Sequence, residues 1–346
     1  MPRLKLAISL GTDLAALRTN ARAYEDAGAD IILVPESYGA DAVSTLGYLA
    51  ATTERVELMS AILPIYSRTP TLLAMTAAGI DSLSDGRFTL GIGASGAQVV
   101  EGWHGVPFDA PVGRTREVID ICRSVWRRDR VEHSGRRYAI PLPPDRGTGL
   151  GRPLKLIHQP VRPVIPVYVA ALGAATVQLA AEVADGWIPH LYVAERAARV
   201  WADPLAAGAA KRDAALGPLG IVAGGPMAIG RDVTDLREDD RAHLALYIGG
   251  MGARNANFYN RLIAQYGWEA DAERIQDLYL DGHTREAAAA IPPEILEATS
   301  FIGDEHYIRD RLAACLDQGV TVVQATPAGP DPLGDIRRMA DILHSL

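Results

Sequence analysis

Residues 88–98 read F-T-L-G-I-G-A-S-G-A-Q and place Gly91, Gly93 and Gly96 in the spacing G-x-G-x-x-G after a short apolar run. This spacing marks a dinucleotide site where it opens the first strand and helix of a domain, with the helix beginning directly after the glycines. Here three strand and helix patterns precede the glycines, and the next helical pattern begins only near Gly113. We therefore interpret the stretch as a glycine-rich strand end rather than as a nicotinamide site.

Apolar runs and helical patterns alternate on both sides of this stretch. The runs are continuous, which is typical of strands buried on both faces of a parallel sheet. They predict strands at residues 4–10, 31–34, 56–65, 88–92, 165–170, 186–191, 221–229 and 320–325. Eight strands separated by helical stretches predict an α/β protein of the (β/α)8 TIM-barrel class, with right-handed crossovers and the active site at the carboxyl ends of the strands.

Two stretches are longer than this repeat requires. Residues 131–163 are rich in proline and glycine, and residues 231–301 have a mainly helical pattern. Neither is bounded by a linker-like segment, so we expect a single domain over residues 1–346 that carries two insertions. We expect both insertions to build the mouth of the barrel.

Composition narrows the class of protein and its partners. The formal net charge is -8 and no run of basic residues stands apart from acidic ones, which argues against nucleic acid and anionic membranes as partners. Cys122 and Cys315 lie in helical patterns outside any C-x-x-C spacing, as expected of buried free thiols in a reducing compartment. Without a signal-peptide pattern or a membrane-length apolar run, we expect a cytoplasmic protein. The histidines have no metal-ligand spacing, so we expect no metal site.

Seven motifs then occur in a familiar order. They are V-P-E-S-Y-G (34–39), S-A-I-L-P-I-Y-S-R-T-P (60–70), L-S-D-G-R-F-T-L-G-I-G-A-S-G (83–96), V-V-E-G-W-H-G-V-P-F (99–108), Y-V-A-A-L-G (168–173), A-D-G-W (184–187) and G-G-M-G-A-R-N-A-N-F-Y-N (249–260). The series resembles the bacterial luciferase-like flavin family, and most closely the branch that uses the deazaflavin coenzyme F420. The resemblance spans nearly the whole chain and agrees with the barrel predicted from the strands.

This resemblance implies a cofactor site at the strand ends. A non-prolyl cis peptide at the end of the third strand, here Ser60-Ala61, would support the back of the flavin-like ring. Backbone amides at a helix start suit an anion, so the loop after the fifth strand would hold the cofactor phosphate. Beyond Ser60 and Ala61, the positions implied to bind the cofactor are Gly93, Ser95, Gly96, Gln98, Ala171, Leu172, Gly173, Ala174 and Trp187.

Three residues are candidates for proton transfer. Glu36 stands where the family often places an acid at the tip of the second strand, but Ser37 follows it where many members have histidine. A glutamate that some members carry after the fourth strand is replaced here by Gly96. His104 and His190 are the other candidates, because imidazole transfers protons near neutral pH.

Three functional hypotheses follow. The first is a coenzyme F420-dependent oxidoreductase that transfers hydride between C5 of the deazaflavin and a small organic substrate. The second is an FMN-dependent luciferase-like monooxygenase, and the third is a non-catalytic protein that binds flavin or deazaflavin. The resemblance also implies a homodimer, whereas the identity of the substrate stays open.

Overall fold

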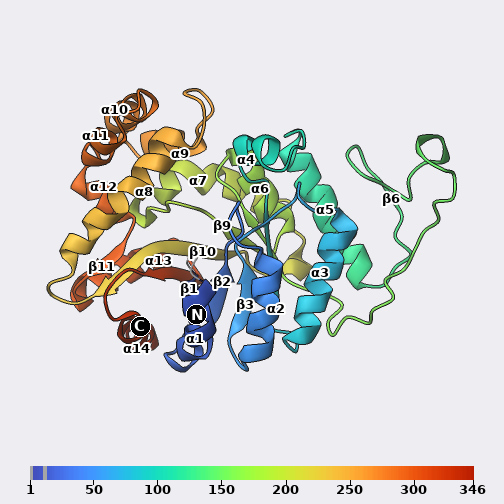
Figure 1. Cartoon of the computed structure of the whole chain (residues 1–346), viewed down its shortest axis with the longest axis horizontal. Helices are drawn as coiled ribbons and strands as arrows, with labels where there is room; N and C mark the ends of the chain where they lie inside the picture. The colour runs from blue at the N-terminus through green and yellow to red at the C-terminus, as the bar shows by residue number, and fades with distance from the viewer. Residues whose placement is uncertain (1–2, 11–13) are drawn as a thin grey trace.

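The computed structural model describes residues 3–10 and 14–346, and within them eight parallel strands close into a barrel (Figure 1). The strands are β1 (Lys5–Ser9), β2 (Ile31–Val34), β3 (Glu57–Ser60), β5 (Phe88–Gly93), β8 (Val167–Ala170), β9 (Gly186–Ile188), β10 (Gly220–Ile229) and β12 (Val322–Pro327). The barrel closes because β12 pairs with β1 and β10 pairs with both β9 and β12. The predicted (β/α)8 TIM barrel is confirmed.

Helices cover the outside of this barrel. They are α1 (Leu14–Asp26), α2 (Ala42–Thr52), α3 (Pro70–Leu83), α5 (Pro111–Trp126), α6 (Ala174–Val183), α7 (Ala194–Ala209), α13 (Glu305–Asp317) and α14 (Pro332–His344). Several begin at a residue that suits a helix start: the side chains of Asp41, Thr69 and Asp304 accept hydrogen bonds from amides in the first turns of α2, α3 and α13.

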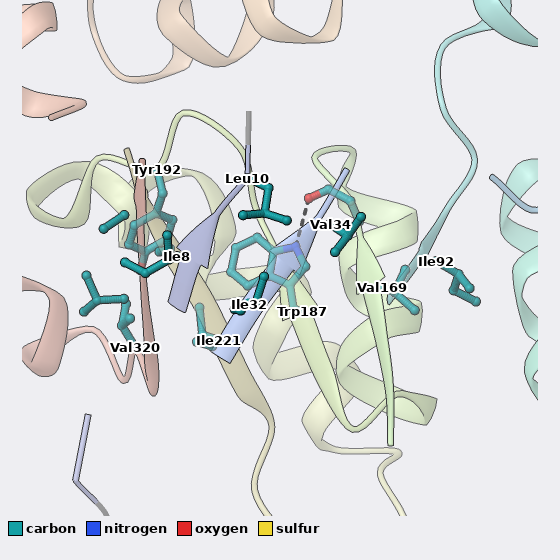
Figure 2. Close-up of a cluster of buried hydrophobic side chains, with 14 of the residues drawn as sticks. Ile8, Leu10, Ile32, Val34, Ile92, Val169, Trp187, Tyr192, Ile221 and Val320 are labelled. Atoms are coloured by element: carbon teal, nitrogen blue, oxygen red, sulfur yellow. Dashed lines mark hydrogen bonds between the residues drawn. The ribbon is translucent and has the colours of Figure 1, made fainter. Parts of the chain in front are cut away.

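Strand alternation divides the core into two clusters. Side chains that face the barrel interior come from most of its strands and form a small cluster: Ala7, Ile31, Leu33, Met59, Ile188, Val222 and Val322. The residues between them along each strand face outward and pack under the helices. Figure 2 shows part of this outer cluster, in which Val169 of β8 and Ile221 of β10 lie on the two strands beside Trp187.

Two short strands differ from the prediction. The run predicted as one strand over residues 56–65 divides into β3 and β4 (Leu63–Pro64). A further strand, β11 (Phe301–Gly303), pairs with the last residues of β10 and was not predicted. Both strands are too short for a period of two to stand out in a single sequence.

The first insertion begins and ends near the amino ends of the barrel strands. It contains β6 (His133–Ser134) and β7 (Ala139–Ile140), which pair antiparallel, and the short helix η1 (Pro144–Arg146). Because it connects α5 to the start of β8, it runs past the amino ends of the strands, where Arg162 donates to the carbonyl of Phe88. It projects from the barrel (Figure 1). The hairpin of β6 and β7 reaches back along α5, where Arg137 pairs with Asp109 just before this helix. Our expectation that the first insertion helps to build the mouth stays a prediction.

The second insertion follows the carboxyl end of β10 and stands on the mouth side. It consists of η3 (Thr234–Asp240), α8 (Arg241–Ala245), the π-helix η4 (Leu246–Gly250), α9 (Phe258–Gln265), α10 (Glu269–Leu280), α11 (Thr284–Ala289) and α12 (Pro293–Ala298). The helices α8 to α12 gather at the upper left of Figure 1. The predicted helical character of this segment is confirmed.

Candidate active site

The loops at the carboxyl ends of the strands carry all three candidate proton carriers. Glu36 follows β2, His104 follows the short helix α4 (Ala97–Gly102), and His190 follows β9. In TIM-barrel enzymes these loops hold the catalytic residues. The fold therefore brings the three candidates to one end of the molecule.

The glycine-rich stretch ends β5 at Gly93, and α4 begins directly after Gly96. We expected no helix there, and that prediction is wrong. The helix has six residues and buries Val100, which is too little for a helical period to be recognised. The barrel topology, rather than a missing helix, distinguishes this stretch from a dinucleotide fingerprint.

Gly91 and Ser60 hold β3 and β5 together. A Cβ atom at Gly91 would lie 1.8 Å from the carbonyl oxygen of Ser60. The Ser60 hydroxyl accepts from the Gly91 amide and donates to the Gly91 carbonyl, each at 2.9 Å. Ser60 is fully buried, so its side chain links two strands and is not free to contact a cofactor.

The non-prolyl cis bond joins Ala61 and Ile62, one residue later than Ser60-Ala61. Ser60 still pairs with Val34 in the sheet, and the amide of Ala61 donates to the Val34 carbonyl. The strand therefore keeps its regular backbone through Ser60, which corrects the predicted position. Ala61 is only partly buried, as a position lining a cofactor must be.

The other positions assigned to the cofactor after β5 differ in exposure. Gly93 is buried at the end of the strand, Ser95 is half-buried, and Gly96 and Gln98 are exposed. Gly93 faces the barrel interior beside the side chain of Ile62. These four positions form one continuous rim of the mouth, and their contact with a cofactor stays a prediction.

The loop between β8 and α6 presents the start of a helix to the mouth. Gly173 precedes α6 and makes no side-chain capping bond. The first amides of a helix have no partner within it. The indole of Trp187 donates to the carbonyl of Ala171 at 2.8 Å, and the indole of Trp201 donates to the carbonyl of Leu172 at 3.2 Å. With these carbonyls bound behind the loop, the amides from Gly173 and Ala174 onward are suited to an anion.

Trp187 itself does not line the mouth. It is fully buried, and its ring contacts that of Trp201 with centroids 5.0 Å apart. The dashed line in Figure 2 marks its hydrogen bond to Ala171. The assignment of Trp187 to the cofactor is corrected, because Ile188 faces the barrel interior and alternation turns Trp187 toward the helices. It supports the loop after β8 from behind.

Glu36 is held by an arginine. Its side chain is only 10% exposed, and its two oxygens accept from Arg68 at 2.6 and 2.8 Å. One of them also accepts from the amide of Ala42, and Arg68 extends to Asp41. The hydrogen bond with Glu36 raises the pKa of Arg68. Glu36 thus ties the loop after β2 to the loop before α3, and its oxygens are already in use.

His104 and His190 differ from Glu36 in that each has a ring nitrogen without a hydrogen-bond partner among the described residues. In both rings this nitrogen is Nε2, and it is buried. Burial, and after it the nearby His243, lowers the pKa of His190 to about 4. His190 is therefore a neutral imidazole at neutral pH with one free ring nitrogen.

Aromatic rings surround His190. Its ring centroid lies 4.7 Å from that of Tyr247, 5.6 Å from that of Tyr259 and 6.3 Å from that of His243. Tyr247 and His243 are themselves 4.5 Å apart. These rings come from the second insertion, so the insertion forms a wall of the mouth beside β9.

Sequence reasoning missed His243 and Asp240. Burial raises the pKa of Asp240 to about 6 and lowers that of His243. With Tyr247 they stand at positions i, i+3 and i+7, while Leu244 and Ile248 are buried on the other side of the helix. Titratable residues at helical spacing opposite buried apolar residues were the signal in the sequence from which these two residues could have been found.

A model of the luciferase-like monooxygenase family matches residues 2–322. The chain belongs to this family. A curated relative, a putative coenzyme F420-dependent oxidoreductase of Mycobacterium tuberculosis, is 38% identical to this luciferase-like chain over 317 residues, 91% of each protein. The 5,10-methylenetetrahydromethanopterin reductase of Archaeoglobus fulgidus is 26% identical over 89% of this chain and 88% of the relative.

A solved structure agrees with the fold. The coenzyme F420-dependent tetrahydromethanopterin reductase of Methanopyrus kandleri superposes on the luciferase-like chain with a TM-score of 0.80, 21% identity and 99% coverage of both chains. The predicted resemblance is confirmed, and the chain is an oxidoreductase of the luciferase-like family.

Over residues 3–10 and 14–346, no three His, Cys, Asp or Glu side chains are grouped so that they could hold a metal ion. No helix in the same ranges is long and apolar enough to cross a membrane.

Proposed function

We propose that this chain is a coenzyme F420-dependent oxidoreductase that transfers hydride between C5 of the deazaflavin and a small organic substrate. The observation that carries the proposal is the barrel mouth itself, which joins an uncapped helix start at Gly173 with the unpartnered imidazole of His190. A helix start suits the phosphate of the cofactor, and a free imidazole suits the proton that accompanies hydride. The F420-dependent relative at 38% identity supports the choice of cofactor.

The residues present fit such a cofactor. The amides from Gly173 and Ala174 onward would hold its phosphate, and Trp187 and Trp201 would keep this loop in place. Ala61 and the rim at Gly93, Ser95, Gly96 and Gln98 would line its ring. The bound cofactor supplies the carbon that accepts or donates hydride, and the protein orients the substrate and excludes water.

We assign the transfer of the proton to His190 and keep His104 as a second candidate for this role. A proton carrier needs a free lone pair or proton that faces the reacting group. Glu36 has both oxygens on Arg68, whereas the ring nitrogen of each histidine is unpartnered. Glu36 then acts by holding the loops at the mouth and touches no substrate.

Binding of purified protein to coenzyme F420 and to FMN, measured separately by fluorescence titration, tests this function. We expect saturable binding of F420 that is lost in Gly173→Asp, since a carboxylate at the helix start repels phosphate. Gly47→Asp on α2 is the matched control, because no described atom lies within 4 Å of a Cβ placed there. Tight binding of FMN without affinity for F420 would overturn the proposal in favour of a monooxygenase.

The non-catalytic alternative needs a separate measurement. We expect wild-type protein to change the absorbance of oxidised or reduced F420 when it is offered a panel of alcohols, aldehydes and enones. Binding of F420 without turnover of any panel member would favour a protein that only binds the cofactor.

We infer that the chain forms a homodimer and that the first insertion belongs to the contact. Three aliphatic side chains of this segment are strongly exposed: Leu150 (78%), Leu154 (76%) and Ile157 (96%). Large aliphatic side chains left exposed along one short segment are typical of protein interfaces. In sedimentation equilibrium we expect a dimer for the wild type and a monomer for the triple serine variant of these positions. A monomeric wild type, or a dimeric variant, would contradict this inference.

We also infer a cytoplasmic location from the two cysteines. Cys122 and Cys315 are buried free thiols, and burial raises their pKa values to about 12 and about 11. Unreactive free thiols suit a reducing compartment. Fractionation of the native host with an antibody to the chain is the test, and recovery outside the cytoplasm would contradict the inference.

A further inference from the structure

Aromatic side chains stand exposed at the barrel mouth. Among the described residues, four aromatic side chains are exposed: Tyr38, Tyr48, Trp103 and Phe258. Tyr48 lies on α2, whereas Tyr38 follows β2, Trp103 ends α4 and Phe258 begins α9. Both α4 and α9 stand above the barrel in Figure 1. Exposed apolar surface that gathers in one place is typical of a binding site.

We propose that Tyr38 and Trp103, here named the mouth pair, select a substrate that is flat, conjugated and uncharged. This inference deepens the proposed function and rests on it, because the mouth pair would hold the molecule that exchanges hydride with the coenzyme. When an alcohol of this class is oxidised, its carbinol carbon gives a hydride with its electron pair to the coenzyme and its hydroxyl gives up a proton. The product is the conjugated carbonyl compound.

The two rings of the mouth pair form an open wedge. Their centroids lie 6.4 Å apart and their planes are tilted by 48°. Tyr38 is 55% and Trp103 is 68% exposed, so both rings keep open surface although they lie beside each other. Aromatic rings prefer offset or edge-to-face arrangements with centroids about 4.5–7 Å apart. A flat ring can therefore pack on one member of the pair and meet the other with its edge.

The backbone beneath each ring of the mouth pair is held in place. On the side of Tyr38, both oxygens of Glu36 accept from Arg68, which fixes the loop after β2. On the other side, the amide of Trp103 donates to the carbonyl of Val99 at 2.9 Å and closes the last turn of α4. The rings are thus presented to solvent from fixed positions, which reduces the entropy that a ligand must offset.

Further rings continue from the mouth pair toward His190. Burial raises the pKa of Tyr247, and the phenol of Tyr38 raises it further, so the two phenols lie within electrostatic reach of each other. The ring centroid of Tyr247 lies 4.7 Å from that of His190 and 4.7 Å from that of Tyr259. An aromatic wall therefore leads from the mouth pair to the imidazole to which we assign proton transfer. A ring seated on the mouth pair would direct its functional carbon along this wall.

The ions next to the mouth pair are already paired. Glu36 and Asp41, which stand on either side of Tyr38 in the chain, both pair with Arg68. Burial, and after it the nearby histidine, lowers the pKa of His190 to about 4, so this ring is uncharged at neutral pH. An ionic group would lose water at this wall without gaining a counter-charge, which costs free energy. The surroundings therefore favour an uncharged substrate.

Fluorine NMR of apo protein labelled with fluorinated tryptophan tests the mouth pair directly. Of the five tryptophans only Trp103 is exposed, and Trp103→Phe assigns its resonance. We expect cinnamyl alcohol, a flat conjugated probe, to shift the Trp103 resonance and to leave that of buried Trp126 unchanged. Cyclohexylpropanol, with as many carbon atoms and a ring that is not flat, is expected to need a roughly twofold to tenfold higher concentration.

Two variants separate the wedge from general apolar attraction. Tyr38→Leu keeps an apolar side chain but removes one ring, so we expect affinity for cinnamyl alcohol to fall roughly twofold to tenfold. Tyr48→Leu is the matched control, because Tyr48 is an exposed tyrosine on α2, outside the mouth pair. No shift of the Trp103 resonance, equal affinity for the two alcohols, or equal losses in the two variants would overturn the proposal.

A kinetic measurement then examines the same pair in the loaded enzyme. With F420 present, we expect Trp103→Leu to raise KM for cinnamyl alcohol more than it lowers kcat, because the ring acts in binding. The NMR test uses no cofactor, so it decides the role of the mouth pair even if F420 does not bind and the proposed function is overturned. Conversely, binding of F420 without a shift of the Trp103 resonance would overturn only the mouth pair.

Discussion

At Gly91 the wall of the barrel has no room for a side chain. A methyl group there would lie 1.8 Å from a backbone oxygen of β3, so the two strands would have to separate. We expect Gly91→Ala to lose 4 kcal/mol or more of unfolding free energy, the order of about 4–5 kcal/mol seen for severe core disruption. Gly96→Ala, with no described atom within 4 Å, is expected to change it by less than about 0.5 kcal/mol. Urea unfolding compares the two, and equal losses would contradict this account.

His190 makes stability depend on pH. Its pKa is about 4 in the folded chain and ordinarily 6.5, so between these values the unfolded chain binds more protons. The stability due to the neutral ring is complete above pH 6.5 and is lost as the pH falls toward 4. The contribution of Asp240 has the opposite dependence on pH. Its pKa is raised to about 6 in the folded chain, so its contribution to stability is present at low pH and is lost as the pH rises through 6.

We therefore predict a shift between wild type and His190→Gln. When the pH falls from 7 to 4.5, the wild type is expected to lose about 2–3 kcal/mol more unfolding free energy than the variant. The size follows from about 1.4 kcal/mol for each unit by which the pKa is shifted. Urea unfolding at both pH values measures it. His283→Gln serves as the control, and a difference that does not change with pH would show that His190 is not held neutral by burial.

The loop between β8 and α6 shows how one element supports another. Trp187→Phe leaves the carbonyl of Ala171 without its donor, which is expected to cost about 1–3 kcal/mol of unfolding free energy. The loosened loop is also expected to weaken F420 binding severalfold. Trp126→Phe is the control, because this buried indole donates to Ala74 between α5 and α3, away from the mouth. An equal loss of affinity in both variants would contradict a specific role of Trp187.

Distinct apolar runs decided which elements were predicted. Each barrel strand carries such a run, even the three-residue β9, whereas α4, β4 and β11 are short and have no separate run of their own. The course of the first insertion could not be predicted for another reason. Its composition indicates a loop, but only its connection from α5 to β8 and the pair of Arg137 with Asp109 show that it runs along α5.

For the whole molecule we propose one domain that unfolds in one step. β12 lies between β10 and β1, so the last strand completes the barrel that the first strand begins. Leu244 and Ile248 of the second insertion belong to the same buried cluster as the outer barrel residues. We expect urea transitions followed by far-ultraviolet circular dichroism and by tryptophan fluorescence to coincide. A separate transition for the insertion would contradict a single domain.

The sequence by itself determined the barrel, the family and the mouth as the place of the site. Each of these follows from local patterns: apolar runs, helical spacing and motifs in a shared order. The candidates Glu36 and His190 were also found in this way, without a means of choosing between them.

Only the tertiary structure decided what those residues do. Arg68, 32 positions further along, occupies both oxygens of Glu36, while His190 keeps a free nitrogen among rings from residues 243–259. Strand alternation within the closed barrel turned Trp187 into a support for the loop that it was expected to share with a cofactor. Burial and pairing set the state of an ionisable group, and both depend on neighbours that folding brings from distant parts of the chain.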